Sequence, residues 1–264
     1  MTTVNDILAF METIAPQSKK ESWDNVGLSC GRLGKEVRTI LVALDPFEDV
    51  AEEAVQRGAD LIVTHHPLLF HPAYAVTGET AIGRTLMTLI RHDIAAFSAH
   101  TNLDIAPEGV GSCLADALGL EDISVIDPTE RGRDGEIWGL LRKGTVPEQP
   151  LERFLAHVRS ALEAPGLRYA PGGKAVHRVA VGGGACADEW RAALSAGCDT
   201  FVTSDARYND FWDARDAGLT LIDAGHFYTE NPVCRYLQRI LRDAFPEVDV
   251  ELSRTHRDCT KFFL

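Results

Sequence analysis

The stretch "LIVTHHPLLFHP" (residues 61–72) joins an apolar, β-branched run to two adjacent histidines, His65 and His66. The run predicts a buried strand. Successive side chains of a strand point to opposite faces, so two neighbouring imidazoles inside a strand cannot converge on one partner. Pro67 has no backbone N–H to donate and predicts that the strand ends before it. Both rings are therefore expected beyond the carboxyl end of the strand, at the edge where open α/β sheets bind ligands.

Further apolar runs alternate with helical periodicity along the chain. Strands are expected at residues 39–45, 60–66, 94–100, 135–144, 177–183, 200–205 and 219–225. Helices are expected at residues 4–15, 47–58, 80–92, 109–118, 150–163, 188–196, 207–217 and 231–244. Short connections between these strands and helices imply parallel pairing, with helices on the faces of the sheet, so the predicted fold class is α/β.

The length of 264 residues suits one large domain or two smaller lobes. The segment "EDISVIDPTERGRDGE" (121–136) is rich in charge, glycine and proline, and it is predicted to be the linker that divides the chain. The first lobe is expected over residues 1–125, completed by residues 235–264, and the second lobe over residues 130–234.

Two pairs of segments indicate a weak internal repeat. The aligned segments are "GADLIVTHH" (58–66) with "GCDTFVTSD" (197–205), and "SAHTNLD" (98–104) with "AGHFYTE" (224–230). The second alignment places His100 on His226 and Asp104 on Glu230. General similarity among α/β units is an alternative explanation for the first match, whereas the two matches together favour two related lobes.

Three strand ends carry histidine or carboxylate side chains, and this pattern predicts a shared metal site. Imidazole is the most frequent nitrogen ligand of zinc and iron. His226 and Glu230 are four residues apart, so they share one helix face. A cap or a surface ion pair is the alternative for each stretch taken alone. The candidate ligands outnumber those of one tetrahedral zinc, so two ions are expected, with Asp104 and Glu230 as bridging carboxylates.

The chain resembles the Nif-three-like family of dinuclear-metal proteins, whose members are often named GTP cyclohydrolase I type 2 homologues. The resemblance rests on "ESWDNVGLSCG" (21–31), "ADLIVTHHPLLF" (59–70), "SAHTNLD" (98–104) and "IDAGHFYTE" (222–230), in the order of the family. It implies five metal ligands, which fall on His65, His66, Asp104, His226 and Glu230. His100 is left as a neighbour of these ligands.

The same resemblance implies two similar α/β lobes of layered sheets flanked by helices, two divalent metal ions in the cleft between the lobes, and a ring-shaped homohexamer. Longer relatives carry an extra domain between the lobes, for which this chain is too short. One segment departs from the family pattern. Relatives commonly read Thr-Gly-Asp followed by a histidine, whereas "TSDARYND" (203–210) has Ser204 for the glycine and Asn209 for the histidine. Proton transfer by that histidine is therefore put in question.

Two other segments are interpreted mainly as structural. In "WDNVG" (23–27), Asp24 and Asn25 are predicted to cap a turn, and Gly27 to allow an unusual backbone angle. In "VAVGGGACADEW" (179–190), a tight turn is favoured over a phosphate cradle, because the dinucleotide and P-loop fingerprints are lacking.

Composition narrows the functional classes. The net charge of −13 leaves little basic surface for a nucleic-acid backbone, so nucleic acid is not an expected partner. Six scattered cysteines without metal-knuckle spacing indicate reduced thiols and a cytoplasmic location. No stretch resembles a signal peptide or reaches the roughly 18 apolar residues of a membrane span, so no membrane association is expected.

Two functions of different classes are consistent with these residues. The first is a metal-dependent hydrolase for a small molecule, with a nucleotide or a phosphoester-like compound as the candidate substrate, in which His100 and Asp205 transfer protons. The second is a non-enzymatic metal-binding, metal-delivery or regulatory protein that uses the same site. Histidine and carboxylate ligands together suit zinc, iron or manganese.

Overall fold

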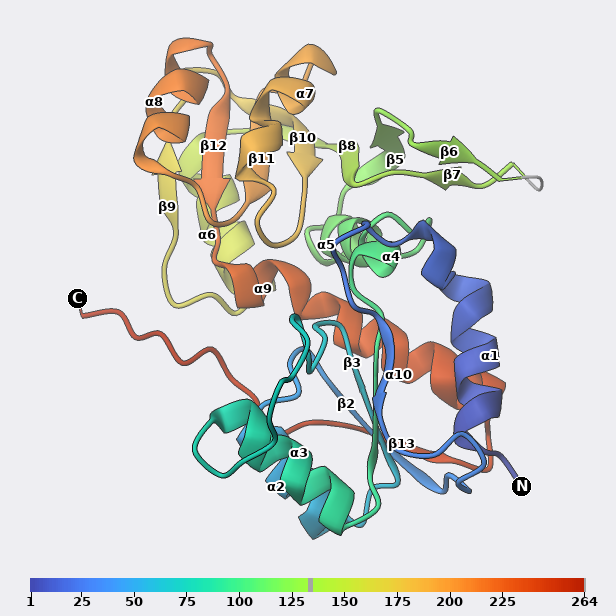
Figure 1. Cartoon of the computed structure of the whole chain (residues 1–264). Helices are drawn as coiled ribbons and strands as arrows, with labels where there is room; N and C mark the ends of the chain where they lie inside the picture. Colours follow the sequence, from blue (N-terminus) through green and yellow to red (C-terminus); the bar gives the residue numbers. More distant parts are fainter. Residues whose placement is uncertain (133–134, 264) are drawn as a thin grey trace. The chain divides into compact units, whose positions relative to one another are not determined.

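The computed structural model describes residues 1–132 and 135–263, and the chain divides into two compact units. The first unit comprises Met1–Leu103 and Val233–Arg257. The second comprises Asp104–Pro232 and the residues from Asp258 onward. Each unit is built around a sheet of its own (Figure 1).

The sheet of the first unit has five strands in the order β1-β4-β3-β2-β13. These are β1 (Gly27–Cys30), β2 (Thr39–Ala43), β3 (Leu61–Thr64), β4 (Ala95–Ser98) and β13 (Asp249–Leu252). Neighbouring strands from β13 to β4 pair in parallel, and the edge strand β1 is antiparallel. The carboxyl ends of β2, β3 and β4 therefore lie at one edge, where Asp45, His65 and His100 follow them.

Helices cover both faces of this sheet (Figure 1). They are α1 (Val4–Ile14), α2 (Glu48–Arg57), α3 (Ala81–Arg91) and α10 (Pro232–Ala244). A short 3₁₀ turn lies at Gln17–Lys19, and the chain passes into the second unit within the single turn α4 (Thr101–Asp104). Alternate strand residues face opposite sides, so Leu41 and Ile62 pack in one core cluster with Leu86 and Leu89 of α3. Helix α2 ends at Gly58, which takes the left-handed conformation with φ 64°.

The sheet of the second unit has six strands in the order β5-β8-β10-β11-β12-β9. These are β5 (Glu121–Ile126), β8 (Leu141–Gln149), β9 (Arg168–Ala170), β10 (Val176–Val181), β11 (Thr200–Thr203) and β12 (Thr220–Asp223). The three strands β10, β11 and β12 are parallel, whereas β5, β8 and β9 pair antiparallel with their neighbours. A separate two-stranded ribbon is formed by β6 (Glu130–Arg131) and β7 (Ile137–Trp138).

Two core clusters lie on opposite faces of this second sheet. The helices are α5 (Val110–Ala117), α6 (Leu151–Ala161), α7 (Trp190–Ser195) after a 3₁₀ turn at Ala187–Glu189, α8 (Tyr208–Asp216) and α9 (His226–Glu230). Val179 and Val202 pack with Phe154 of α6 on one face. Phe201 packs with Trp190 of α7 on the other face. Because successive side chains of β10 and β11 point to opposite sides, apolar residues on these strands bury both faces of the sheet.

The two units share one strand order. In the first unit, the antiparallel edge strand β1 precedes β2, β3 and β4, and the sheet runs β1-β4-β3-β2. In the second unit, the antiparallel edge strand β9 precedes β10, β11 and β12, and the sheet runs β9-β12-β11-β10. This common topology supports the internal repeat, because β3 corresponds to β11 and β4 to β12, as the two alignments place them.

The α/β class with layered sheets flanked by helices is confirmed, and three details of the prediction are wrong. The expected strand at residues 135–144 is divided between β7 of the ribbon and β8 of the second sheet. Residues 121–136 are not a linker, because β5 joins the second sheet and β6 joins the ribbon; residues 133 and 134 of that segment lie outside the described residues. Pairing is not wholly parallel, because each sheet also has antiparallel strands. Among the described helices, none is long and apolar enough to cross a membrane.

Candidate metal centre

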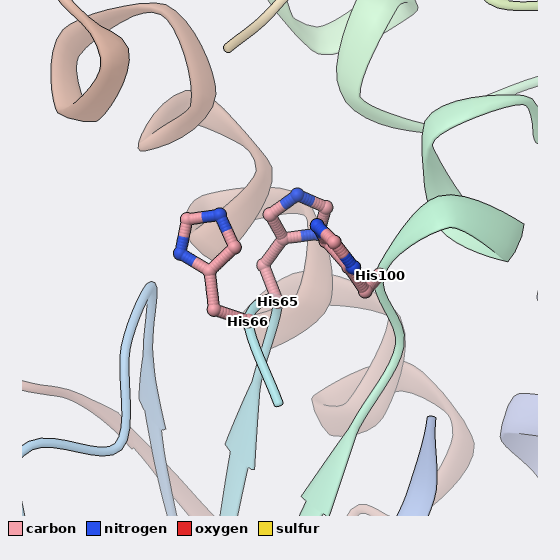
Figure 2. Close-up of side chains that lie close together, drawn as sticks. All are labelled: His65, His66 and His100. Atoms are coloured by element: carbon pink, nitrogen blue, oxygen red, sulfur yellow. The ribbon is translucent and has the colours of Figure 1, made fainter. Parts of the chain in front are cut away.

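Three histidines of the first unit meet at the carboxyl edge of its sheet. His65 and His66 follow β3, and His100 follows the adjacent strand β4 (Figure 2). The ring centroids are 4.8 Å apart for His65 and His66, and 5.1 and 5.3 Å from each of these to His100. One nitrogen of each ring lies within 4.8 Å of the others, so the three imidazoles offer a cluster of ligand atoms of the size that a metal ion needs.

The backbone leaves the strand at the point that the sequence predicts. The last residue of β3 is Thr64, whose hydroxyl donates to the carbonyl oxygen of His66 at 2.7 Å. The amide of His66 donates to the carbonyl of Leu44 at 2.9 Å. These two bonds fix a turn in which adjacent histidines no longer obey strand alternation.

Each imidazole is oriented through its Nδ1 atom. His65 Nδ1 lies 3.0 Å from the carbonyl oxygen of Ala99. His66 Nδ1 lies 2.7 Å from Asp45 Oδ1, and His100 Nδ1 lies 3.0 Å from Asp24 Oδ1. An N–H at Nδ1 places the lone pair of a neutral ring on Nε2. Metal-binding histidines commonly have this arrangement, in which the second nitrogen donates to a carboxylate or a carbonyl.

Asp45 serves two histidines at once. Its Oδ1 atom lies 2.7 Å from His66 Nδ1, and its Oδ2 atom lies 2.9 Å from His256 Nε2. Burial raises the pKa of Asp45, but the hydrogen bonds from His256 and His66 outweigh this effect and hold the pKa well below its ordinary value. The carboxyl group is therefore ionised and keeps the N–H of His66 directed toward it.

Asp24 holds His100 in the same manner. The Asp24 side chain is buried, and it accepts the amide and the hydroxyl of Thr101 at 3.1 and 2.6 Å in addition to the His100 ring. Burial raises the pKa of Asp24, and the hydrogen bonds from Thr101 and His100 reverse the shift and lower it. Asp24 of the "WDNVG" segment was predicted only to cap a turn, and the structure shows that its carboxylate also orients His100.

The second unit brings together Asp104, His226 and Glu230. Asp104 ends the short helix α4, and His226 and Glu230 are the first and last residues of α9. A carboxylate oxygen of Asp104 lies within 4.8 Å of one of Glu230. His226 Nε2 lies 3.1 Å from Glu230 Oε2, one helical turn away. Two carboxylates and an imidazole therefore form a second cluster of ligand atoms.

Asp205 orients His226 as Asp45 orients His66. Asp205 Oδ2 lies 2.8 Å from His226 Nδ1. Burial lowers the pKa of His226, but Glu230 and then Asp205 raise it more strongly, to about 9. Without a bound cation, the His226 ring therefore carries a second proton at neutral pH. Binding of a cation to Nε2 must release that proton.

A glycine-rich loop after β10 makes room for Glu230. Gly184 has φ +63°, and a Cβ atom at this position would lie 2.0 Å from Glu230 Oε1. The amide of Gly184 donates to the Thr229 hydroxyl at 3.0 Å. The hydroxyl of Ser204 donates to the carbonyl oxygen of Gly184 at 2.6 Å. The glycines of the "VGGGACADEW" segment thus permit close approach of a carboxylate, which neither the turn nor the phosphate interpretation anticipated.

A family model described as Duf34/NIF3 (NGG1p interacting factor 3) matches residues 2–259. This chain belongs to the Duf34/NIF3 family. A relative from Clostridium perfringens, named "GTP cyclohydrolase 1 type 2 homolog", is 34% identical over 98% of this chain and 99% of the relative. A relative of the same name from Streptomyces coelicolor is 37% identical over 89% of this chain and 84% of the relative.

Two solved structures have the same fold. Staphylococcus aureus hypothetical protein SA1388 shares 30% identity and a TM-score of 0.92, with 99% of each chain covered. A Bacillus cereus protein related to NIF3 shares 26% identity and a TM-score of 0.93, with 100% of this chain and 99% of that chain covered. The resemblance to the Nif-three-like family is thereby confirmed.

Two other residues of this NIF3 protein, Asn209 and Cys186, have no metal-binding role in the structure. Asn209, at the place of the expected family histidine, is exposed on α8. Burial raises the pKa of the Cys186 thiol far above its ordinary value, and the charges of Asp104 and Glu230 raise it further, so this cysteine stays protonated. Sequence reasoning missed Asp45, although it ends the predicted strand 39–45 and obeys the same strand-end rule as His65. It also missed His256, which no pattern in the sequence marks.

Proposed function

We propose that this NIF3 protein binds two divalent metal ions through His65, His66, Asp104, His226 and Glu230. The observation that carries the proposal is the donor chemistry of the two units. The first unit supplies imidazoles with Nδ1 already engaged, and the second supplies two carboxylates and an imidazole. The family resemblance supports the view that the two sets of donors serve one centre.

The residues fit a pair of borderline divalent ions. Imidazole nitrogen and carboxylate oxygen together suit zinc, iron or manganese, and none of the five donors is a thiolate. Five protein ligands exceed the four of a single tetrahedral site. Because a carboxylate can bridge two ions about 3.5–4 Å apart, Asp104 and Glu230 are proposed as the bridging ligands.

The proposed activity is hydrolysis of a nucleotide or a phosphoester-like substrate. The name of the C. perfringens relative, "GTP cyclohydrolase 1 type 2 homolog", supports this substrate class. Two bound ions would polarise the electrophile and lower the pKa of a bound water. His100 then accepts and returns a proton at Nε2, while Asp24 stabilises the charged ring through Nδ1. Asp205 holds His226 in its ligating orientation.

The activity test compares two ligand variants with a surface control. His66→Ala and Glu230→Gln are expected to lower turnover of the best substrate from a panel of nucleotides and aryl phosphoesters by at least about 1000-fold, because a metal ligand is lost from each unit. His92→Ala, an exposed histidine at the end of α3, is expected to match the parent enzyme.

Circular dichroism of each variant verifies that it is folded. Full turnover by either ligand variant in metal-free buffer would contradict the dinuclear mechanism. Parent protein that holds two ions and turns over no member of the panel would favour the metal-binding or metal-delivery function instead.

A cytoplasmic location and a homohexameric assembly belong to the same proposal. None of the six cysteines, all of which lie within the described residues, forms a disulfide, as expected for a reducing compartment. The hexamer rests on the resemblance to the family.

A further inference from the structure

Two exposed aromatic side chains contact His100 in the first unit. Trp23 is 61% exposed and Phe70 is 41% exposed. The Trp23 and His100 rings are 6.0 Å apart at 74°, and the Phe70 and His100 rings are 5.4 Å apart at 80°. Large aromatic residues are normally covered by the protein, so two of them exposed around one imidazole form an apolar surface beside the histidine cluster.

Polar contacts, and not burial, fix the position of these rings. Asp24, the residue next to Trp23, is 5% exposed and is bound to Thr101 and His100. The side-chain amide of Asn25 donates to the carbonyl oxygen of Leu69 at 2.6 Å. This bond joins the segment that carries Trp23 to the segment that carries Phe70.

The Trp23 segment has a further anchor at its beginning. The amide of Glu21 donates to the Thr101 hydroxyl at 2.9 Å. The ammonium group of Lys20 donates to the carbonyl oxygens of Glu21 and Asp24, so the basic residue closest to Trp23 in sequence holds the turn. A segment anchored at residues 20, 21, 24 and 25 presents its tryptophan to solvent in a defined orientation.

We propose that Trp23 and Phe70 bind the planar heteroaromatic ring of the substrate, of the purine nucleoside class, beside the metal-binding histidines. The inference rests on the proposed function and names the part of the substrate that is recognised. Aromatic side chains bind nucleobases by stacking, worth about 1–3 kcal/mol per base, which corresponds to roughly 5- to 150-fold in affinity. The rings of His65 and His66 lie 5.1 and 5.3 Å from His100, so a ring held by these aromatics lies close to the ligand cluster.

The binding test uses guanosine, adenosine and ribose as probes for the metal-loaded protein, by isothermal titration calorimetry. The parent is expected to bind a purine nucleoside and not ribose. Trp23→Leu and Phe70→Ala are expected to weaken nucleoside binding by about 10-fold or more, because the apolar or small replacement cannot stack. Trp23→Phe keeps an aromatic face and is expected to stay within about 3-fold of the parent.

The matched control is Trp212→Ala, which removes a 45% exposed tryptophan that packs against Arg215 in the second unit. It is expected to bind nucleosides like the parent. Unchanged binding in Trp23→Leu and Phe70→Ala, binding of ribose as tight as that of the nucleosides, or no nucleoside binding by the parent would each overturn the inference. Metal content is measured on the same samples, so a parent without metal reveals failure of the proposed function, whereas a fully loaded parent with unaffected variants reveals failure of ring recognition alone.

Discussion

Replacement of Gly184 by alanine is expected to lower metal affinity by about 100-fold, the upper end of what the loss of a residue that positions a metal ligand costs. The new Cβ atom would lie 2.0 Å from Glu230 Oε1, far inside contact distance, and 3.2 Å from His226 Cε1, which is a tight contact. Gly184 is itself held by Thr229 and Ser204, so the loop cannot withdraw without loss of hydrogen bonds. The Glu230 carboxylate must therefore move away from its position beside Asp104. Titration of zinc or manganese into the metal-free protein measures the change.

Gly119→Ala is the matched control for backbone strain. Gly119 has φ +66°, close to the +63° of Gly184, and nothing lies within 4 Å of the Cβ that alanine would add. Both variants should lose about 1–2 kcal/mol of stability from the left-handed conformation, but only Gly184→Ala should lose metal affinity. Equal metal affinity in the two variants would show that Glu230 is not a ligand or that its position is unimportant.

Glu53→Gln is expected to lower the free energy of unfolding by about 3 kcal/mol at neutral pH. Glu53 lies on α2 and is 3% exposed. Its carboxylate accepts hydrogen bonds from the hydroxyls of Ser253 and Thr255 at 2.5 and 2.7 Å and from the amide of Arg254 at 2.9 Å. It also forms an ion pair with Arg57 at 2.6 Å. A glutamine at this position presents an N–H₂ group to these donors. The segment that it would release leads directly to His256, the second partner of Asp45.

The pH dependence of this effect has a defined sign. Burial raises the pKa of Glu53, but hydrogen bonds from Ser253, Arg254 and Thr255 outweigh it and lower the pKa to about 2 from 4.5. A carboxylate with a depressed pKa in the folded state contributes stability that is present above about 4.5 and is lost as the pH falls toward 2. The difference between parent and variant in urea unfolding should therefore shrink over that range.

Glu52→Gln removes the same charge from the exposed neighbouring position on α2 and is expected to change stability by less than about 0.5 kcal/mol. A Glu53→Gln variant as stable as Glu52→Gln at pH 7 would contradict the assignment. A stability difference that is constant from pH 7 to pH 3 would do so as well.

The periodicity of apolar residues predicted most of the fold, because this pattern is a property of each short segment by itself. All eight expected helices occur, and so do β2, β3, β4, β10, β11 and β12, within a few residues of the expected bounds. The edge strands were missed for physical reasons. Most residues of β1, β5, β9 and β13 are exposed or half-buried, so none of these strands carries a continuous apolar run. The charged character of β5 is also what made residues 121–136 resemble a linker.

The site was predicted to the extent that strand ends mark it. His65, His66 and His100 were expected at one sheet edge, and the parallel order of β3 and β4 brings them there. Asp45 follows β2 and carries the same strand-end signal, so it could have been predicted. Asp24 and His256 could not, because they are distant in sequence and reach His100 and Asp45 only through tertiary contacts. The role of Gly184 likewise depends on a carboxylate 46 residues away in the chain.

Metal content per chain, measured by elemental analysis on protein purified without chelator, tests the dinuclear centre most directly. The parent is expected to hold about two ions per chain, and the His65→Ala/His66→Ala double variant to lose them while it remains folded. No metal in the parent, or the same content in parent and double variant, would contradict the account.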